Sequence, residues 1–162
     1  MEPSLISYNV AISACGKGVQ WERALCMLAE IQEQRLEPNE ISYNVPISAC
    51  ARGGEWERAL KMLAEMQEQR LEANVIRYSA AISACETGKQ WRWALELLTS
   101  MQEQHLEANV ISYNAAISAC EKGEMWTAAL AMLSEMQERS LEPDVISYNA
   151  LISACEICEQ WE

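Results

Sequence analysis

The sequence of 162 residues contains no hydrophobic run as long as the ~18 residues that a membrane-spanning helix requires. It has a single histidine, His105, and no grouping of a nucleophile, a base and an orienting residue that would indicate catalysis. His105 stands where equivalent segments have Arg35 and Arg70, which indicates a solvated residue near the C-terminal end of a helix. We therefore expect a soluble intracellular protein that does not enter a membrane, is not an enzyme and holds no metal or cofactor.

Positive charge is also scarce in this chain. It has 12 basic and 24 acidic residues, so its formal net charge is −12. Such a balance at first argues against a nucleic-acid partner. The sum hides the positions of the charges, however, and these depend on how the chain folds.

What the sequence has in abundance is repetition. The motif Ile-Ser-Tyr-Asn or its variant Ile-Arg-Tyr-Ser occurs at residues 6–9, 41–44, 76–79, 111–114 and 146–149. The tyrosines of successive copies are 35 residues apart, and so are one tryptophan and one cysteine per copy. A strict period of this length is typical of stacked repeat proteins, in which no unit buries its apolar face alone. We expect one solenoid domain over residues 1–162, with repeats at 5–39, 40–74, 75–109 and 110–144 and an incomplete repeat at 145–162.

Each repeat contains two segments with the spacing of an amphipathic helix. In the first repeat, apolar residues recur at helical intervals from about Ile6 to Cys15 and again from about Trp21 to Gln34. Glycines interrupt the first segment, and the turn at residues 36–39 ends the second. Each repeat is therefore predicted to be an antiparallel helical hairpin. The fold class that follows is all-α, a right-handed α-solenoid of stacked hairpins.

The seven cysteines do not indicate disulfides. Their number is odd, and equivalent positions in stacked hairpins lie roughly 10 Å apart, beyond the reach of a disulfide. We expect reduced, buried thiols that pack as small apolar side chains. Cys155 and Cys158 form a C-x-x-C pair, but no further ligands accompany them, so we interpret the pair as coincidental.

A helical wheel of the first segment places a polar stripe opposite its buried side. Starting from Ile6, the side chains of Asn9, Ser13 and Lys17 share an arc of about 80°. Stacking would align this stripe with its equivalents, which are Ile41, Asn44, Ser48 and Arg52, then Ile76, Ser79, Ser83 and Thr87, then Ile111, Asn114, Ser118 and Lys122. In the resulting groove an isoleucine can contact a flat base, an amide can bond the base edge and a cation can meet phosphate. Because a repeated isoleucine beside a repeated asparagine is unusual on a purely solvated face, we favour a binding surface.

The acidic residues largely avoid this stripe. All but five of the 24 carboxylates fall in the second segments, just before them or in the closing turns. Glu30 and Glu33 represent the set that is expected to point outward on the convex side. The groove is therefore predicted to be close to neutral or basic, and the net charge weakens a nucleic-acid function without excluding it.

The recurring motifs resemble the pentatricopeptide repeat family, in its P-type repeats of 35 residues. Repeat 110–144 has the Ile-Ser-Tyr-Asn start at 111–114, Ala-Leu at 129–130 and Glu-Pro-Asp at 142–144. Tetratricopeptide repeats run at 34 residues and lack this start. The resemblance implies a monomer, alone or with other protein subunits, that binds single-stranded RNA in a chloroplast or mitochondrion. There it would act in RNA processing, stability or translation, although no transit peptide is visible in the sequence.

The resemblance also assigns roles to residues. In that family the fifth and last residues of a repeat select the base, which here gives Asn9 with Asn39, Asn44 with Asn74, Ser79 with Asn109 and Asn114 with Asp144, while Asn149 belongs to the incomplete repeat. The second residues, which stack on the bases, are Ile6, Ile41, Ile76, Ile111 and Ile146. Lys17, Arg52 and Lys122 would meet phosphate. Asn-Asn pairs resemble pyrimidine readers, Ser-Asn an adenine reader and Asn-Asp a uracil reader, so the expected site is 5′-pyrimidine-pyrimidine-A-U-3′.

Several residues depart from the repeat pattern. Pro46 lies inside a first helix, where proline typically costs ~3 kcal/mol and kinks the helix, so we expect it to disturb the orientation of Asn44. Arg77 replaces the usual serine and is expected to face partly away from the groove. Thr87 and Ile157 lack the cation of the other repeats. Four complete repeats with three cations are therefore expected to bind weakly.

Two other functions stay open. The same groove could hold an extended peptide and serve as a protein-interaction scaffold of the tetratricopeptide kind, which the acidity favours slightly. The chain could also be an inactive piece of a longer array. A change of base preference at the third nucleotide on mutation of Ser79 and Asn109 would support RNA reading, whereas binding of a peptide without RNA would support the scaffold.

Overall fold

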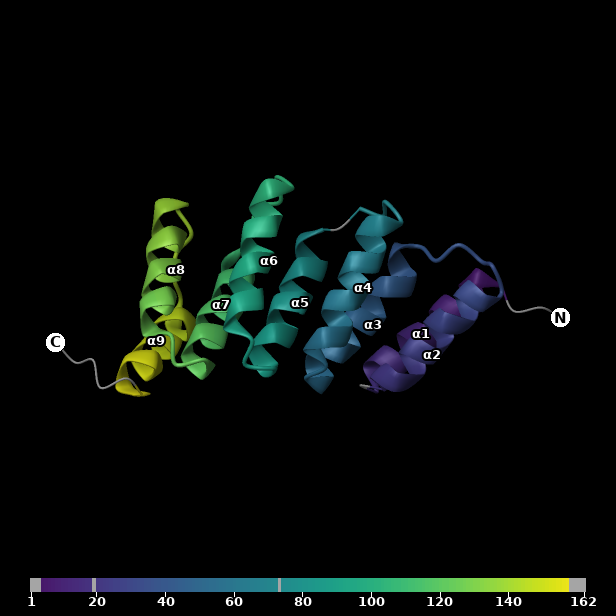
Figure 1. Ribbon diagram of the computed structural model, residues 1–162, viewed down its shortest axis with the longest axis horizontal. Coiled ribbons are helices and arrows are strands. Elements are labelled where there is room, and N and C mark those ends of the chain that lie inside the picture. The colour runs from purple at the N-terminus through teal and green to yellow at the C-terminus, as the bar shows by residue number, and fades with distance from the viewer. Residues whose placement is uncertain (1–3, 19, 73, 158–162) are drawn as a thin grey trace.

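The computed structural model describes residues 4–18, 20–72 and 74–157. Within these ranges nine helices and no strands follow one another along an elongated solenoid (Figure 1). The helices are α1 (Leu5–Lys17), α2 (Trp21–Glu33), α3 (Glu40–Gly53), α4 (Trp56–Glu68), α5 (Val75–Thr87), α6 (Trp91–Glu103), α7 (Val110–Lys122), α8 (Trp126–Glu138) and α9 (Val145–Ile157). The predicted all-α, right-handed solenoid of helical hairpins is confirmed.

The helices form two rows that differ in how closely they pack. The first helices of the hairpins lie side by side in succession, α1 with α3, α3 with α5, α5 with α7 and α7 with α9. Each second helix packs on its own first helix and on the next one. In the described part of the chain the backbones of second helices stay further apart, and these helices meet only through long side chains such as Gln102 and Glu135. The closely packed row therefore forms the inner wall of the solenoid, and the second helices form its outer side.

The first helices begin at polar residues that cap them. The side chains of Asn39, Asn74 and Asn109 accept hydrogen bonds from backbone amides in the first turns of α3, α5 and α7. Asp144 does the same for α9, through the amides of Ile146 at 2.9 Å and Ser147 at 3.0 Å. An Asn or Asp at this position satisfies amides that a helix leaves unpaired at its start. The last residue of each proposed repeat is thus the N-cap of the following helix.

The repeated tyrosine and cysteine pack in the interior between neighbouring hairpins. Tyr43 and Tyr78 are fully buried, as is Cys85. Cys50, Cys85 and Cys120 are free thiols, as expected from the sequence, and burial raises their pKa to about 11, 12 and 11. Cys158 lies outside the described residues, and so does the interpretation of its pairing with Cys155.

Pro46 does not interrupt the helix that contains it. Helix α3 continues past this residue to Gly53, and Pro46 is buried in the row of first helices. The expected disturbance of Asn44 therefore does not come from a broken helix. It has a different cause, which lies in the neighbouring repeat.

None of the helices in residues 4–157 is both long enough and apolar enough to cross a membrane. Over the same part of the chain, His, Cys, Asp and Glu side chains do not gather into a group of three or more that could hold a metal ion.

Candidate nucleic-acid interface

A row of isoleucines remains exposed on the first helices. Each is the second residue of its helix. Their side chains are 75%, 52%, 73%, 65% and 59% exposed for Ile6, Ile41, Ile76, Ile111 and Ile146. A core isoleucine of the same helices, such as Ile47, is fully buried. The protein itself does not cover these apolar side chains, which leaves them free to contact a ligand.

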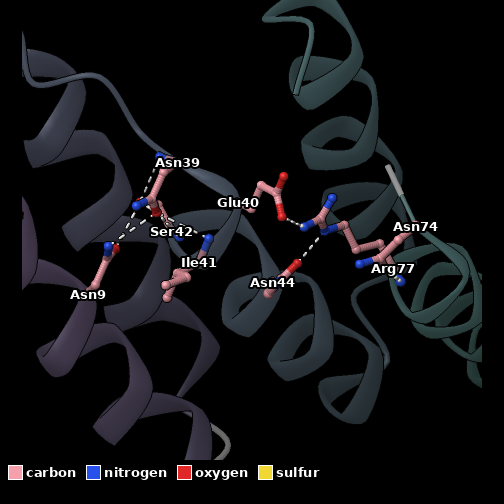
Figure 2. A network of polar contacts seen from close by, with 8 residues as sticks. All are labelled: Asn9, Asn39, Glu40, Ile41, Ser42, Asn44, Asn74 and Arg77. Atoms are coloured by element: carbon pink, nitrogen blue, oxygen red, sulfur yellow. Dashed lines mark hydrogen bonds and ion pairs between the residues drawn. The ribbon is translucent and has the colours of Figure 1, made fainter. Parts of the chain in front are cut away.

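The first predicted base-reading pair is formed directly. Asn9 Nδ2 donates to Asn39 Oδ1 at 3.2 Å, and Ser42 Oγ donates to Asn9 Oδ1 at 2.8 Å (Figure 2). Asn39 Oδ1 also accepts from the backbone amides of Ile41 and Ser42 as the cap of α3. Hydrogen bonds from Ser42 Oγ and from two backbone amides therefore fix the orientation of the two side-chain amides. Among the described residues Asn39 Nδ2 has no acceptor, so its donors are available to a ligand.

Asn9 is more buried than the helical wheel predicted. The wheel placed it opposite the buried side, but the residue is only 9% exposed. The cause is the close packing of α1 against α3, which brings Ser42 over the side chain of Asn9. A single helix cannot reveal burial of this kind, because the covering residue belongs to the next hairpin.

A cavity of 630 Å³ opens beside this pair. Its walls come from α1, from the cap of α3 and from the first turn of α3, and its lining residues are Ile6, Asn9, Val10, Ser13, Ala14, Lys17, Asn39 and Ile41. Two exposed isoleucines, a polar pair and one cation thus surround a single space. A flat, polar-edged group such as a nucleobase needs apolar contact on its faces and hydrogen-bonding groups at its edge.

The fourth pair has the same arrangement with a carboxylate. Asn114 Nδ2 donates to both carboxylate oxygens of Asp144, at 3.0 and 3.1 Å, and Ser147 Oγ donates to Asn114 Oδ1. Hydrogen bonds to Asp144, the strongest from the backbone of Ser147, lower the pKa of this carboxyl. The reading pair of the fourth repeat therefore carries a negative charge at neutral pH, which the first pair does not.

The third pair is linked through a serine. Ser79 Oγ donates to the carbonyl of Val75 at 2.7 Å and lies 2.7 Å from Ser112 Oγ. Ser112 Oγ also lies 3.1 Å from Asn109 Oδ1, and its single proton can go to either of these two neighbours. Ser79 and Asn109 thus share a neighbour, although no direct hydrogen bond between them is found among the described residues.

In the second repeat the predicted pair is separated. Arg77 Nε donates to Asn44 Oδ1, and Arg77 Nη2 donates to Glu40 Oε2 at 2.7 Å (Figure 2). Asn74 accepts a hydrogen bond from the backbone amide of Arg77, and in the described structure none joins it to Asn44. Arg77 was expected to face partly away from the groove, and its side chain lies enclosed in the protein rather than on the groove surface. It is 2% exposed because its side chain fills the space between two first helices.

The sequence interpretation missed the serines that hold these pairs. Ser42, Ser112 and Ser147 are the third residues of their repeats and are fully buried. Each contacts the fifth residue of the preceding repeat. The signal was present, since serine follows isoleucine in four of the five motif copies, but its partner lies 33 residues earlier.

The three predicted phosphate contacts differ in their availability. Lys17 lines the cavity of the first repeat. Arg52 donates to the carbonyl of Gly16, and Lys122 Nζ lies 2.8 Å from Glu86 Oε1 in an ion pair. Two of the cations would therefore give up or share an existing partner to contact a phosphate. Asn149, the fifth residue of the incomplete repeat, is exposed on α9.

Models of the pentatricopeptide repeat match the whole length of this helical array. The PPR repeat family matches residues 3–52 and 108–156, the pentatricopeptide repeat domain matches residues 61–125, and the PPR repeat matches residues 41–71. The chain belongs to the pentatricopeptide repeat family. Among curated protein sequences none matches it.

Solved structures of the family share the fold. One is the pentatricopeptide repeat protein PPR10 in complex with an 18-nucleotide psaJ RNA element, with a TM-score of 0.79 and 27% identity. The match covers 98% of this chain but 23% of that one. A second structure, PPR10 from maize, has a TM-score of 0.83 at 20% identity, covering 98% of this chain and 23% of that one. The PPR domain of Arabidopsis thaliana protein-only RNase P 1, in complex with tRNA, has a TM-score of 0.81 at 15% identity, covering 92% and 79%.

Proposed function

We propose that the chain binds single-stranded RNA along the row of first helices, with one base per repeat. The observation that carries this proposal is the cavity between Ile6 and Ile41, where the paired amides of Asn9 and Asn39 stand beside two exposed apolar side chains. The likeness to PPR10, which was solved with an RNA element, supports the same ligand. Binding rather than catalysis is the proposed activity, and it needs no cofactor.

The base-reading roles are proposed for the pairs of fifth and last residues. The pairs Asn9 with Asn39 and Asn114 with Asp144 are held by serines of the following helix, so their donors and acceptors are fixed before a base arrives. A pre-arranged polar pair favours the base whose edge matches it, since an unmatched edge leaves buried groups unpaired. The family's code gives 5′-pyrimidine-pyrimidine-A-U-3′ as the site. A role in organellar RNA metabolism, in a chloroplast or mitochondrion, follows from family membership and is part of the proposal.

Electrostatics predicts a modest affinity for this protein alone. Of the three cations near the groove, Arg52 and Lys122 already have partners, and the net charge is −12. A single strand that meets about three cations loses affinity with salt with a slope of roughly −2 in a double-logarithmic plot. Measurements at low ionic strength therefore give the best sensitivity.

The test is an exchange of reading residues between repeats. Ser79→Asn gives the third repeat the Asn-Asn pair of the first, and Asn9→Ser gives the first repeat the Ser-Asn pair of the third. We expect the preference at the third nucleotide to change from adenine to pyrimidine, and that at the first nucleotide to change the opposite way. Fluorescence anisotropy with RNAs that vary one base at a time measures both. Unchanged preferences in both variants, with both proteins folded, would reject the proposal.

The scaffold alternative is tested in the same experiment. If no RNA variant binds at low salt while an extended peptide competes for the cavity beside Asn9, the groove serves protein recognition. The net charge of −12 is the observation that favours this outcome.

A further inference from the structure

We propose that Arg77 prevents the second repeat from selecting a base, so that the second nucleotide of the site is an unread spacer. This inference rests on the proposed RNA-binding function and refines it. The recognised sequence becomes pyrimidine, any base, A, U.

The position of Arg77 in the repeat is the first argument. It is the third residue of its repeat, where Ser42, Ser112 and Ser147 stand in other repeats. Those serines contact the fifth residue of the preceding repeat through one short hydroxyl group. In the first and fourth repeats this leaves the asparagine Nδ2 directed at the capping residue. Arg77 occupies the same place between neighbouring first helices with a much longer, charged side chain.

The hydrogen bonds of Asn44 are the second argument. Its Oδ1 accepts from the Nε group of Arg77, and within the described structure its Nδ2 makes no bond to Asn74. The equivalent Nδ2 groups of Asn9 and Asn114 both donate to their capping residues. The second repeat thus lacks the direct bond of the first and fourth pairs, and it also lacks the serine that stands between Ser79 and Asn109 in the third.

The burial of Arg77 excludes a replacement role in reading. The residue is 2% exposed, and Nη2 is held by Glu40 at 2.7 Å. Nη1 is buried and has no hydrogen-bond partner among the described residues. A guanidinium enclosed in this way meets neither a base edge nor a phosphate. Ile41 and Ile76 remain 52% and 73% exposed on either side, so a base still has apolar side chains to stack on. Stacking tolerates any base, because every base has an apolar face.

The experiment compares Arg77→Ser with its reciprocal change. Arg77→Ser restores the serine found at the third position of the other repeats. We expect it to create a preference of about tenfold for pyrimidine at the second nucleotide. The double variant Leu5→Glu, Ser42→Arg places the Arg77–Glu40 pair at the equivalent positions of the first repeat. It is expected to abolish the preference at the first nucleotide. Anisotropy titrations with all four bases at each of the four nucleotides give the readout, and circular dichroism verifies folding.

The possible outcomes distinguish a failure of this inference from a failure of the proposed RNA-binding function. In the unaltered chain we expect the four bases at the second nucleotide to bind within about twofold, while the first and fourth nucleotides discriminate. Discrimination at the second nucleotide equal to that at the first overturns the role of Arg77 and leaves the proposed function intact. Discrimination at no nucleotide overturns the proposed function and this inference with it. If one variant does not fold, the other still decides, because each predicts a change at a different nucleotide.

Discussion

The indole of Trp56 lies so close to Gly88 that a Cβ atom built on the glycine would stand 2.2 Å from Trp56 Cδ1. The same relationship joins Trp21 to Gly53, at 2.6 Å, and Trp91 to Gly123, at 2.4 Å. Each tryptophan begins a second helix and covers the end of the next first helix. The tryptophan and glycine therefore share the repeat period because they meet across each of these three junctions.

Gly88→Ala is expected to destabilise the array. The new methyl group overlaps an aromatic ring in a packed junction, and overpacking of this kind typically costs about 1–3 kcal/mol. Chemical unfolding followed by circular dichroism measures the change. Gly18→Ala is the matched control, since Gly18 has the same place in the first repeat but its nearest neighbour to a new Cβ is a flexible Gln20 side chain at 3.5 Å. Equal effects of the two changes would show that the tryptophan contact is not the cause.

The period of 35 residues was enough to predict the helical hairpins and their stacking, because the apolar positions of one repeat define a helix pair and the next repeat must cover it. The exposed row that contains Ile6 and Ile111 could also be predicted from one helix. The contacts of Ser42 and Arg77 could not. They depend on the register between neighbouring hairpins, which places a residue beside a partner 33 positions earlier. A wheel of an isolated helix contains no information about that register.

The residue Asn109 combines a structural and a proposed binding role, and two substitutions separate them. It caps α7 by accepting from the amide of Ser112 at 3.0 Å. Asn109→Ala removes the cap and is expected to cost about 1 kcal/mol of folding free energy. Asn109→Asp keeps an acceptor at a helix start, where negative charge is favourable, so stability should be retained. Both changes should alter the preference at the third nucleotide. A reading defect in the alanine variant alone would assign the effect to lost structure.

Alkaline pH should destabilise the protein through its buried thiols. Burial raises the pKa of Cys85 to about 12 and that of Cys50 and Cys120 to about 11, from an ordinary value of 9.0. Below pH 9 both the folded and unfolded chains hold these protons, so the thiols give no pH dependence. Above pH 9 the unfolded chain ionises first, and stability is lost until the folded pKa values are passed. Urea unfolding at pH 7, 9 and 10.5 measures the decline.

The triple variant Cys50→Ala, Cys85→Ala, Cys120→Ala is the control for that decline. It should be less stable than the parent at pH 7, since buried apolar atoms are lost, but its stability should change less between pH 9 and 10.5. Tyr113 remains in both proteins, with a pKa raised to about 12 mainly by burial, so a residual slope is expected above pH 10. A variant with the same slope as the parent would contradict the assignment to the thiols.

His105 has a backbone φ of 57°, in the left-handed region, just after α6 ends. Arg35, Arg70 and Ser140 take the same conformation at equivalent positions. A residue with a side chain pays roughly 1–2 kcal/mol in this region, whereas glycine does not. Glycine loses more chain entropy on folding, by roughly 0.5–1 kcal/mol, so His105→Gly should stabilise the protein by about 0.5–1 kcal/mol. Gln104→Gly, at a φ of −87° in the same turn, should bring only the entropic loss. Thermal melting of the two variants beside the parent distinguishes them, and a lower melting temperature for His105→Gly would mean that the imidazole makes a contact worth more than the strain it carries.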